Sequence, residues 1–501
     1  MLSFLVVATL WISHGFAELV VPDPTFKDLA PVPRHVWADS LANRADATAS
    51  VALADYEKFM WASSEMPGEK PVVVSMIAYS KQNEKIIDMD RFTFALDPTT
   101  SCTAQDFSLR FKHPLIYEAA KVAWDWVNYD DLRSFVIVPS WEGCGGDRSH
   151  DHWVVTKVEF DNKESKIVLE ASPSTWKKVI GTFVLDFGKG TFEQGYNRRN
   201  SFPDLDGSLM LDVSTSFPEE ILIWEDKSGF PNARLRANCT DCSTEGILAL
   251  AGHVEGSLSG TGVKIDKLEL SIKPQGVKIR LGVSLELDGD VDFRDSSQPS
   301  GEVTLLDYPV SGWRVPGVFQ FGPSFKINAG YVIDYIRGTA DFTTGVTAEI
   351  PDTAIVDLDL KAANSGQFYG WTPGIEVNPL ALHAQIDAQT RLYTEIVATV
   401  SLTVLEDNGF GVDLSLKIPQ LTLTTSGGFD ESGFCEPSGG QFGVKIDSTV
   451  GANLVLEGWG EVVGQRVPLA NATLLDAPDL FIFPQVCEAF ATPPEGYPLA
   501  E

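Results

Sequence analysis

The segment "DRSHDH", residues 147–152, gathers side chains that can transfer protons. The chain has only seven histidines, and two of them, His150 and His152, lie here close behind Asp147 and Arg148. Imidazole titrates near neutral pH and suits general acid–base work, while a nearby arginine can hold an electron-rich oxygen. These four residues are therefore candidate catalytic residues that would protonate a leaving hydroxyl. Because Asp, Gly and Ser also favour turns for backbone reasons, a solvated turn is the competing interpretation.

Strand periodicity decides between these two interpretations. If the strand that begins at Trp153 extends backwards, its period of two places His150 and His152 on the same apolar face as Val154, at the edge of a pocket. No third histidine lies near them in the sequence, so we predict neither a metal site nor a cofactor. The sequence also lacks a GxSxG nucleophile elbow, a phosphate loop and a dinucleotide-binding fingerprint.

Two aromatic segments are candidate substrate-binding sites. In "GQFYGWTPG", Phe368, Tyr369 and Trp371 stand in a loop bounded by glycine and proline, where flat rings could stack on a planar ligand or a sugar. In "SGWRVPGVFQFGPSF", Trp313 and Arg314 place a cation beside a ring. Packing of these rings in the core or as loop anchors is the alternative.

The N-terminus predicts secretion. The stretch "MLSFLVVATLWISHGFA" is a short apolar run that ends in small residues, as signal peptides do, and we place the cleavage after Ala17. No other stretch approaches the roughly 20 apolar residues of a membrane span, so we predict none. Two sequons, at Asn238 and Asn471, predict N-glycosylation.

The six cysteines fit an oxidising compartment. Sequence alone does not choose among their possible pairings. Proximity within the proposed domains favours three disulfides: Cys102 with Cys144, Cys239 with Cys242, and Cys435 with Cys487. For the "CTDC" pair, a local structural disulfide is preferred over redox or zinc chemistry, because the chain has no second CxxC.

The charge excludes one class of partner. The 69 acidic and 38 basic residues give a formal net charge of −31. Nucleic acid is a poor partner for such a chain, because little here could neutralise phosphates. Solubility in a mildly acidic medium is sufficient to explain the acidity.

Hydrophobic periodicity predicts a mainly β protein of two β-sandwich-like domains. Short strand patterns, "RFTFAL" among them, run from "VVVSMIAY" to "TFVLDF". They are interrupted by one helix in "PLIYEAAKVAWDWVN", where apolar residues recur at helical spacing. After residue 205 long alternating segments such as "GVKIRLGVSLELDGDVDF" predict a large antiparallel all-β domain. We expect a signal peptide (1–17), an arm or linker (18–70), an N-terminal β domain with one helix (71–200), a C-terminal all-β domain (205–490) and a tail (491–501).

The chain resembles a family of secreted fungal proteins that pair two β modules. The resemblance covers roughly residues 70–490 and rests on "AAKVAWDWVN", "SFVIVPSWEGCGG" and "HWVVTKVEFDNKESKIVLEA" in the first module, and on "ANCTDCSTEGILALAGHVEG" and "FQFGPSFKINAGYVIDY" in the second. Most of this family has no assigned function. Similar all-β secreted proteins include the hetero-Diels–Alderases of fungal tropolone sesquiterpenoid pathways.

The resemblance implies a cofactor-free pericyclase. Such an enzyme would bind a planar tropolone quinone methide and a humulene-type terpene in an apolar pocket, and would join them mainly by proximity and orientation. The alternative is an extracellular or cell-surface protein that binds glycan or another protein without catalysis. A hydrolase is a third possibility. A deep apolar cavity between the modules favours the enzyme, and a flat exposed aromatic platform favours the binder. The oligomeric state is not predicted.

Overall fold

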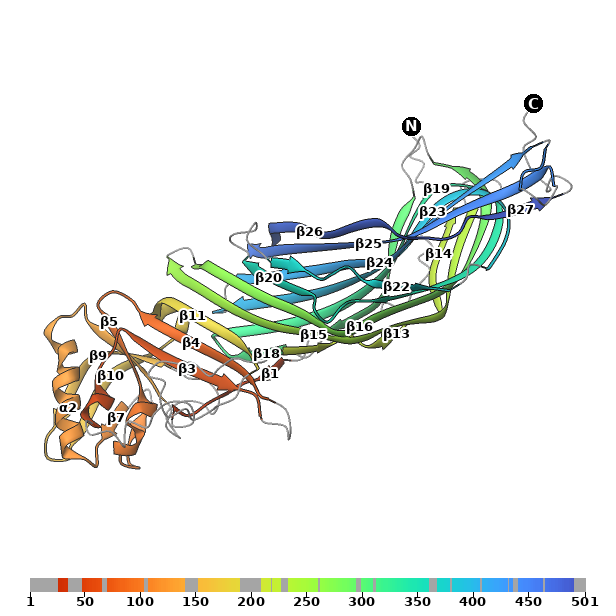
Figure 1. The fold of residues 1–501 in the computed structure, drawn as a ribbon. Coiled ribbons are helices and arrows are strands. Elements are labelled where there is room, and N and C mark those ends of the chain that lie inside the picture. The colour runs from red at the N-terminus through yellow and green to blue at the C-terminus, as the bar shows by residue number, and fades with distance from the viewer. Residues whose placement is uncertain are drawn as a thin grey trace, which may run out of the picture.

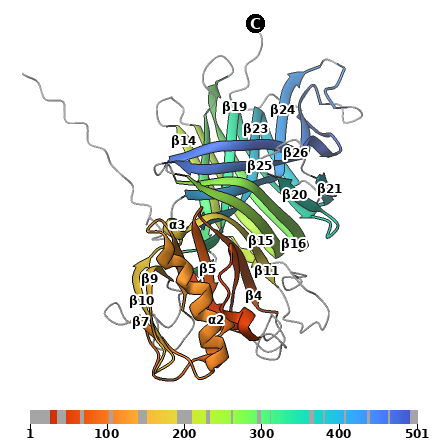
Figure 2. The same cartoon turned by 90° about the vertical axis from the view of Figure 1, so that its left-hand side faces the viewer.

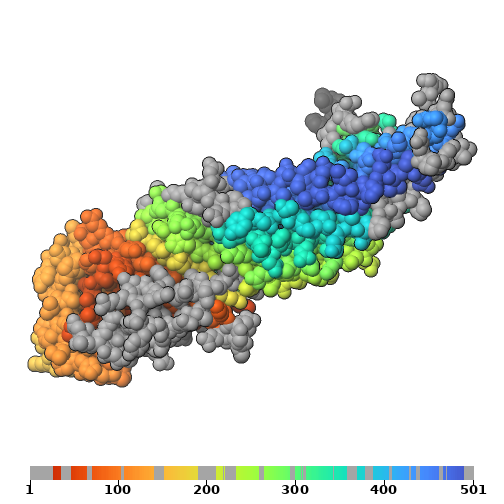
Figure 3. All heavy atoms as spheres, in the orientation of Figure 1, coloured from red at the N-terminus to blue at the C-terminus, as the bar shows by residue number. Residues whose placement is uncertain are grey.

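The molecule is elongated, with a small sheet and a helix at one end and a long twisted sheet that reaches the other end (Figures 1 and 3). The computed structural model describes residues 26–34, 47–64, 70–102, 107–139, 152–189, 209–217, 219–226, 233–259, 262–293, 299–309, 312–359, 367–378, 381–405, 408–430, 432–435, 440–462 and 465–490.

The small sheet is mixed and six-stranded. Its strand order is β5 (Glu84–Asp88), β8 (Ser134–Val138), β9 (His152–Asp161), β10 (Lys166–Ser174), β7 (Phe107–Arg110) and β6 (Ser101–Cys102). Only β5 and β8 pair in parallel. Alternate residues of β8 enter different cores: Phe135 and Ile137 pack beneath helix α2 (Pro114–Trp124), while Val136 and Val138 face the core of the long sheet. The small sheet is thus the middle layer between a helix and a second sheet.

The long sheet is a continuous hydrogen-bonded path. Each strand pairs antiparallel with the next in the series β3 (Tyr56–Ala62), β4 (Val72–Ser80), β11 (Ile180–Lys189), β15 (Ala233–Ser259), β16 (Gly262–Asp292), β19 (Phe319–Glu349), β23 (Ala381–Val404), β24 (Asn408–Phe429), β25 (Phe442–Val462) and β26 (Gln465–Ile482). The link from β11 to β15 joins the first half of the chain to the second.

Shorter elements complete the structure. They are β1 (Phe26–Asp28), β2 (Ala30–Pro31), β12 (Leu209–Asp212), β13 (Thr215–Ser216), β14 (Glu220–Asp226), β17 (Ser300–Pro309), β18 (Gly312–Val315), β20 (Ile355–Asp359), β21 (Gln367–Tyr369), β22 (Gly374–Val377), β27 (Val486–Phe490), the helix α3 (Trp176–Val179) and the 3-10 helices η2 (Ala47–Val51), η3 (Met89–Arg91), η4 (Thr93–Ala95) and η5 (Asp125–Tyr129).

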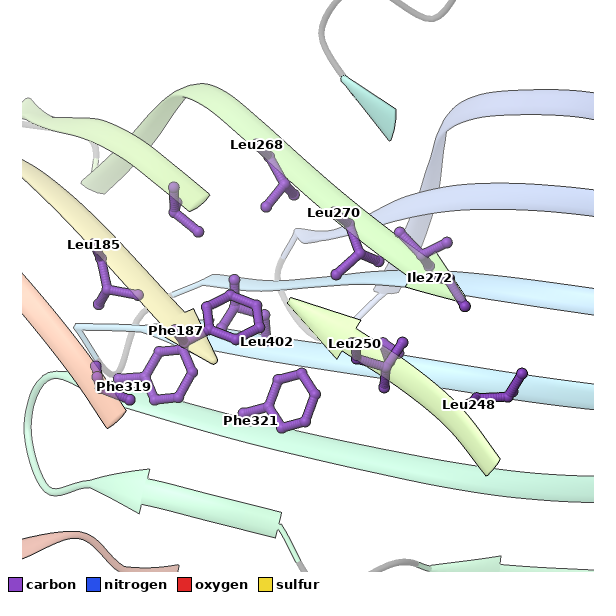
Figure 4. Packing of buried hydrophobic residues seen from close by; sticks show 14 of the residues in the cluster. Leu185, Phe187, Leu248, Leu250, Leu268, Leu270, Ile272, Phe319, Phe321 and Leu402 are labelled. Carbon is purple, nitrogen blue, oxygen red and sulfur yellow. The ribbon is translucent and has the colours of Figure 1, made fainter. Parts of the chain in front are cut away.

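The period-two pattern predicted the buried face of the long strands correctly. Every second residue of β16 from Val277 to Leu287 is apolar and buried, as the alternation requires. Phe187 from β11 and Leu250 and Leu270 from β15 and β16 pack toward Phe319 and Phe321 of β19 (Figure 4). The core therefore lies between two layers that belong to one bent and twisted sheet.

Two details of the sequence prediction were wrong. The "arm or linker" over 18–70 includes β3, a strand in which Phe59, Met60 and Trp61 are buried, because β3 pairs with β4 along its whole length. "RFTFAL" forms η3 and η4 instead of a strand. The side chain of Asp88 accepts a hydrogen bond from the backbone N–H of Asp90 at 3.0 Å, which caps η3 and turns the chain away from β5.

Candidate functional site

Of the four predicted catalytic residues, only His152 lies within the described residues; Asp147, Arg148 and His150 lie outside them. His152 is the first residue of β9 and is buried. The centroid of its ring lies 4.6 Å from that of Trp176, with a 34° angle between the planes. His152 and the half-buried Val154 both pack toward the core that contains Trp176. The imidazole is therefore part of the packing between the two sheets.

The predicted aromatic residues do not share one surface. Trp371 is buried, and its indole N–H donates to the carbonyl oxygen of Ile355 at 3.1 Å, whereas Tyr369 is 56 % exposed. Phe368 pairs with Val356 through its backbone in β21. Trp313 is half-buried on β18, with its ring centroid 6.0 Å from that of Phe321. Trp371 is a core residue, Tyr369 is exposed and Trp313 is half-buried, so these side chains do not form one binding surface.

Arg314 anchors the N-terminal strand. Its Nε donates to a carboxylate oxygen of Asp28 at 2.6 Å, and β1 pairs in parallel with β18 at these two residues. The backbone N–H of Leu29 also donates to the Arg314 carbonyl oxygen at 2.9 Å. This guanidinium therefore has a structural partner within the described chain.

An apolar cavity lies between the layers of the long sheet. Its volume is about 30 Å³, and its lining includes Phe325, Leu414 and Trp371, each of them buried. The hydroxyl of Thr244, a polar group in the lining, donates to the Val213 carbonyl oxygen at 2.6 Å. Ligand pockets for drug-sized molecules are usually about 300–1,000 Å³. In this conformation the cavity has room for about one water molecule.

A buried cluster of charges was not predicted from the sequence. Glu57 of β3 and Asp88 of β5 are both buried, and the Arg34 guanidinium lies 3.0 Å from Glu57 and 3.8 Å from Asp88. Arg91 also pairs with Glu57. Burial, together with the neighbouring Glu57 carboxylate, raises the pKa of Asp88 to about 7. The cluster ties the N-terminal segment to the small sheet. "IIDMDR" contains Asp88 and Arg91 of this cluster, but only the fold brings Glu57 to them.

A second charged group joins the two halves of the molecule. His253 of β15 lies between Asp186 of β11, 2.5 Å from Nδ1, and Glu255, 2.9 Å from Nε2. The hydrogen bond with Asp186 is the main cause that raises the pKa of His253 to about 9. His253 was not among the residues predicted from the sequence to form a site. Its "HVE" spacing was visible, but the position of Asp186 on the neighbouring strand was not.

The helix α2 has an exposed apolar face. Leu115 and Val122, two turns apart, are each 78 % exposed, and Tyr129 and Leu132, which follow the helix, are 70 % and 76 % exposed. We call these four residues the outer α2 face. The opposite side of the helix packs on the small sheet, where Ile116, Tyr117, Ala120 and Trp124 are buried; we call the small sheet and α2 together the small module. In Figure 2 the helix lies on the surface of this module.

Two of the predicted disulfides are present in the described residues. Cys435 pairs with Cys487, across 52 residues, and Cys239 pairs with Cys242. Cys102 is disulfide-bonded, and Cys144 lies outside the described residues.

The Cys239–Cys242 disulfide borders an open hollow of about 600 Å³. We call it the Cys239 hollow; its lining also includes Glu219, Arg236, Asn238 and Asp241. The sequon residue Asn238 is half-buried there, while Asn471 is exposed on β26.

The described residues contain neither a metal-binding cluster nor a membrane-spanning helix. No group of three or more His, Cys, Asp and Glu side chains there is placed to hold a metal ion. No helix in the described ranges is long and apolar enough to cross a membrane.

Comparisons with known proteins identify two modules. Residues 79–184 match the domain of unknown function DUF7029, and residues 211–468 match the domain of unknown function DUF7223. Comparison with curated proteins and with solved structures finds no match to this chain. The first match spans most of the small module, and the second spans most of the long sheet and about half of the chain. The chain therefore belongs to the family defined by DUF7223.

Proposed function

We propose that this protein is an extracellular protein-binding scaffold that associates with a second copy of itself through the outer α2 face. One observation carries the proposal: Leu115, Val122, Tyr129 and Leu132 are each at least 70 % exposed and follow one another along α2, η5 and the turn beyond. Single exposed apolar residues are common on protein surfaces, but several large ones within one short segment favour a protein–protein interface.

The charges at the two ends of the outer α2 face favour a second copy as the partner. Lys112 and His113 precede the helix, while Asp130 and Asp131 follow η5, and all four are exposed. Arg133 lies over the ring of Trp126 at 5.2 Å, and with two carboxylates against this one guanidinium the far end is net acidic. If two copies pair with their helices antiparallel about a two-fold axis, the basic end of each meets the acidic end of the other. The opposed helix dipoles favour the same arrangement.

The interface would be small. The 11 residues of α2 and the five of η5 extend for about 25 Å in total. Two such segments bury less than the roughly 1,200–2,000 Å² of a stable complex, so we expect a weak, reversible dimer. The α2 end of the elongated molecule would be joined to the α2 end of its partner, with both long sheets pointing outward (Figure 1).

The geometry supports binding more than the hetero-Diels–Alderase reaction. A planar tropolone and a terpene together need a pocket of several hundred Å³, but the apolar cavity in the long sheet has about 30 Å³. A glycan site on the aromatic loop is also less well supported, because Trp371 is inside the core and donates to Ile355. Secretion and glycosylation at Asn471, on the exposed side of β26, are parts of the proposal.

Sedimentation equilibrium tests this function. The wild-type protein should self-associate with a dissociation constant in the micromolar range or above. Leu115→Glu/Val122→Glu should be monomeric, since two charges would be buried in the interface. Ile482→Glu is the matched control, because Ile482 is 67 % exposed on β26, far from α2, and its substitution should leave the dimer intact. A wild-type protein that stays monomeric at about 1 mM would contradict the proposal.

A second assay separates this function from the enzyme. Purified protein is incubated with a hydroxymethyl tropolone and a humulene alcohol, and boiled protein is the control. We expect no acceleration of adduct formation. Clear acceleration by the intact protein would favour the pericyclase that the resemblance implies.

A further inference from the structure

The two disulfides in the described residues constrain the chain very differently. Cys435–Cys487 links residues 52 apart and ties the segment before β25 to β27. Cys239–Cys242 links residues three apart within the single strand β15. Since the entropy removed from the unfolded chain grows with the length of the closed loop, the second disulfide stabilises the fold much less by this route.

Strand β15 is also held without its disulfide. Around the cysteines it pairs with β14 and β13 on one side and with β16 on the other. The backbone N–H of Phe217 donates to the Cys242 carbonyl oxygen at 3.1 Å, and the Cys239 N–H donates to the Glu219 carbonyl oxygen. The disulfide therefore adds a bond where the hydrogen-bonded ladders already fix the backbone. Stabilisation of the fold is thus a weak explanation for its presence.

The two sulfur atoms have unequal surroundings. A β-bulge between Cys239 and Asp241 interrupts the pairing of β15 with β16, and bulges often redirect side chains next to functional sites. Cys239 is half-buried on the Cys239 hollow, whereas Cys242 is buried. The Sγ atom of Cys242 lies 3.1 Å from the carbonyl oxygen of Gly282, so a reduced Cys242 would donate its S–H to an acceptor that is already in place. That hydrogen bond favours the reduced form.

The hollow has groups that can hold a polar thiol compound. Its volume of about 600 Å³ is in the range of small-ligand sites. Arg236 lines it: one guanidinium nitrogen, Nη1, lies 3.8 Å from a carboxylate oxygen of Glu286, while Nε has no hydrogen-bond partner in the described part of the chain. A guanidinium binds a carboxylate, while the side chains of Glu219 and Asp241 can accept hydrogen bonds from an amine. A short cysteine-containing peptide carries both groups.

We propose that Cys239 and Cys242 form a thiol–disulfide exchange site that oxidises small peptide thiols bound in the Cys239 hollow. A peptide thiolate attacks Sγ of Cys239, the Cys239–Cys242 bond breaks, and Cys242 leaves as a thiolate, takes up a proton and donates to Gly282. A second peptide thiolate then attacks the peptide sulfur of the mixed disulfide and releases Cys239 as a thiol. Two peptide thiols become one peptide disulfide, and their two protons end on the two cysteines.

Redox titration is the first test. The protein as secreted is equilibrated in glutathione buffers of increasing reducing strength and alkylated, and only then deglycosylated for peptide mass spectrometry. We expect Cys239–Cys242 to be reduced in the folded protein at a glutathione ratio at least 100-fold more oxidising than Cys435–Cys487 requires. Reduction of both disulfides together, or of Cys239–Cys242 only on unfolding, would overturn the proposal.

Single-cysteine variants test which sulfur is attacked and are independent of α2. Cys242→Ser leaves the Cys239 thiol on the hollow, and Cys239→Ser leaves the buried Cys242 thiol. With oxidised glutathione as the probe, Cys242→Ser should form the mixed disulfide at least tenfold faster than Cys239→Ser does. Cys242→Ser/Arg236→Gln should form it more slowly than Cys242→Ser. Equal rates for the two single variants would contradict the assigned roles, while circular dichroism confirms that each variant is folded.

Discussion

The strand β16 and the helix α2 use apolar residues in different ways. In β16 the apolar residues from Val277 to Leu287 all lie on one face, and the other face has charged residues such as Lys278 and Arg280, which pair with Glu349 and Glu245 on neighbouring strands. In α2 one side is buried in the small module, and the other side also carries large apolar residues, Leu115 and Val122.

This difference shows where to look for binding. The outer face of β16 has paired charges and so needs no partner beyond water and its neighbouring strands. The outer α2 face exposes apolar surface that costs free energy in water, about 25 cal/mol for each Å² that a partner could cover. Under the proposed function, the outer α2 face on the small module is where a second copy binds.

The largest expected effect tests whether the two regions fold together. Trp124 is fully buried beneath α2, and its indole N–H donates to the Val51 carbonyl oxygen at 2.8 Å. Trp124→Ala should lower the free energy of unfolding by about 3–5 kcal/mol. Because β11 pairs with both β4 and β15, differential scanning calorimetry should show one transition, shifted to lower temperature.

Phe321→Ala is the matched variant in the long sheet. Phe321 is fully buried between the layers, and its loss should shift the same transition by a similar amount. Two separate transitions, each sensitive to only one of these substitutions, would show that the regions fold independently and would contradict the continuity of the long sheet.

The buried charge cluster should make the free energy of unfolding depend on pH. The pKa of Asp88 is raised from 3.8 to about 7, so between these values the unfolded chain loses a proton that the folded chain keeps. The stability that Asp88 contributes is thus complete below about pH 4 and is lost as pH rises to about 7, with a change of about 2–4 kcal/mol. Denaturant unfolding at pH 4 and pH 7 measures this change.

Asp88→Asn supplies the control for that measurement. An amide keeps an acceptor for the Asp90 N–H but does not ionise. The variant should lose much less stability than the wild type between pH 4 and pH 7. An unchanged pH dependence in Asp88→Asn would assign the effect to other groups.

The junction between the regions should respond to pH in a different window. Because the pKa of His253 is raised from 6.5 to about 9, its contribution is complete below about pH 6.5 and is lost as pH rises through 9. The side chain is a quarter exposed, so solvent screening limits the effect to about 1–2 kcal/mol. Denaturant unfolding of the wild type and of His253→Gln at pH 6.5 and pH 9.5 measures this effect. If the free energy of unfolding falls equally in both proteins, His253 is not the cause.

The smallest expected effect concerns the outer α2 face itself. Leu132 is 76 % exposed in the turn after η5, so Leu132→Ser should change the free energy of unfolding by less than about 0.5 kcal/mol. The same substitution should weaken self-association. A loss of more than 2 kcal/mol in stability would mean that Leu132 belongs to the core of the monomer.

Much of the fold could be predicted from the sequence because the signal is local. The alternation in "GVKIRLGVSLEL" identified the buried face of β16, and the helical spacing around Pro114 identified α2. The polar clusters could not be predicted this way. Asp186 meets His253 because β11 pairs with β15, and Glu57 meets Asp88 because β3 of the long sheet packs against β5 of the small sheet.

The outer α2 face was in the sequence but not in the prediction. The predicted helical pattern consisted of residues on the side that enters the core. Ile116, Ala120 and Val127 belong to that side and are buried. Leu115 and Val122 form a second apolar row seven residues apart, which a helix needs only if both of its sides have a partner.

A charge exchange tests the proposed dimer most directly. In an antiparallel pair, Lys112 of each copy faces Asp131 of the other. Lys112→Asp and Asp131→Lys should each be monomeric in sedimentation velocity at low ionic strength, since like charges then meet twice in each dimer. An equimolar mixture of the two variants should form a 1:1 dimer, because every opposed pair is again attractive. If the mixture stays monomeric while the wild type dimerises, the antiparallel pairing of α2 is wrong.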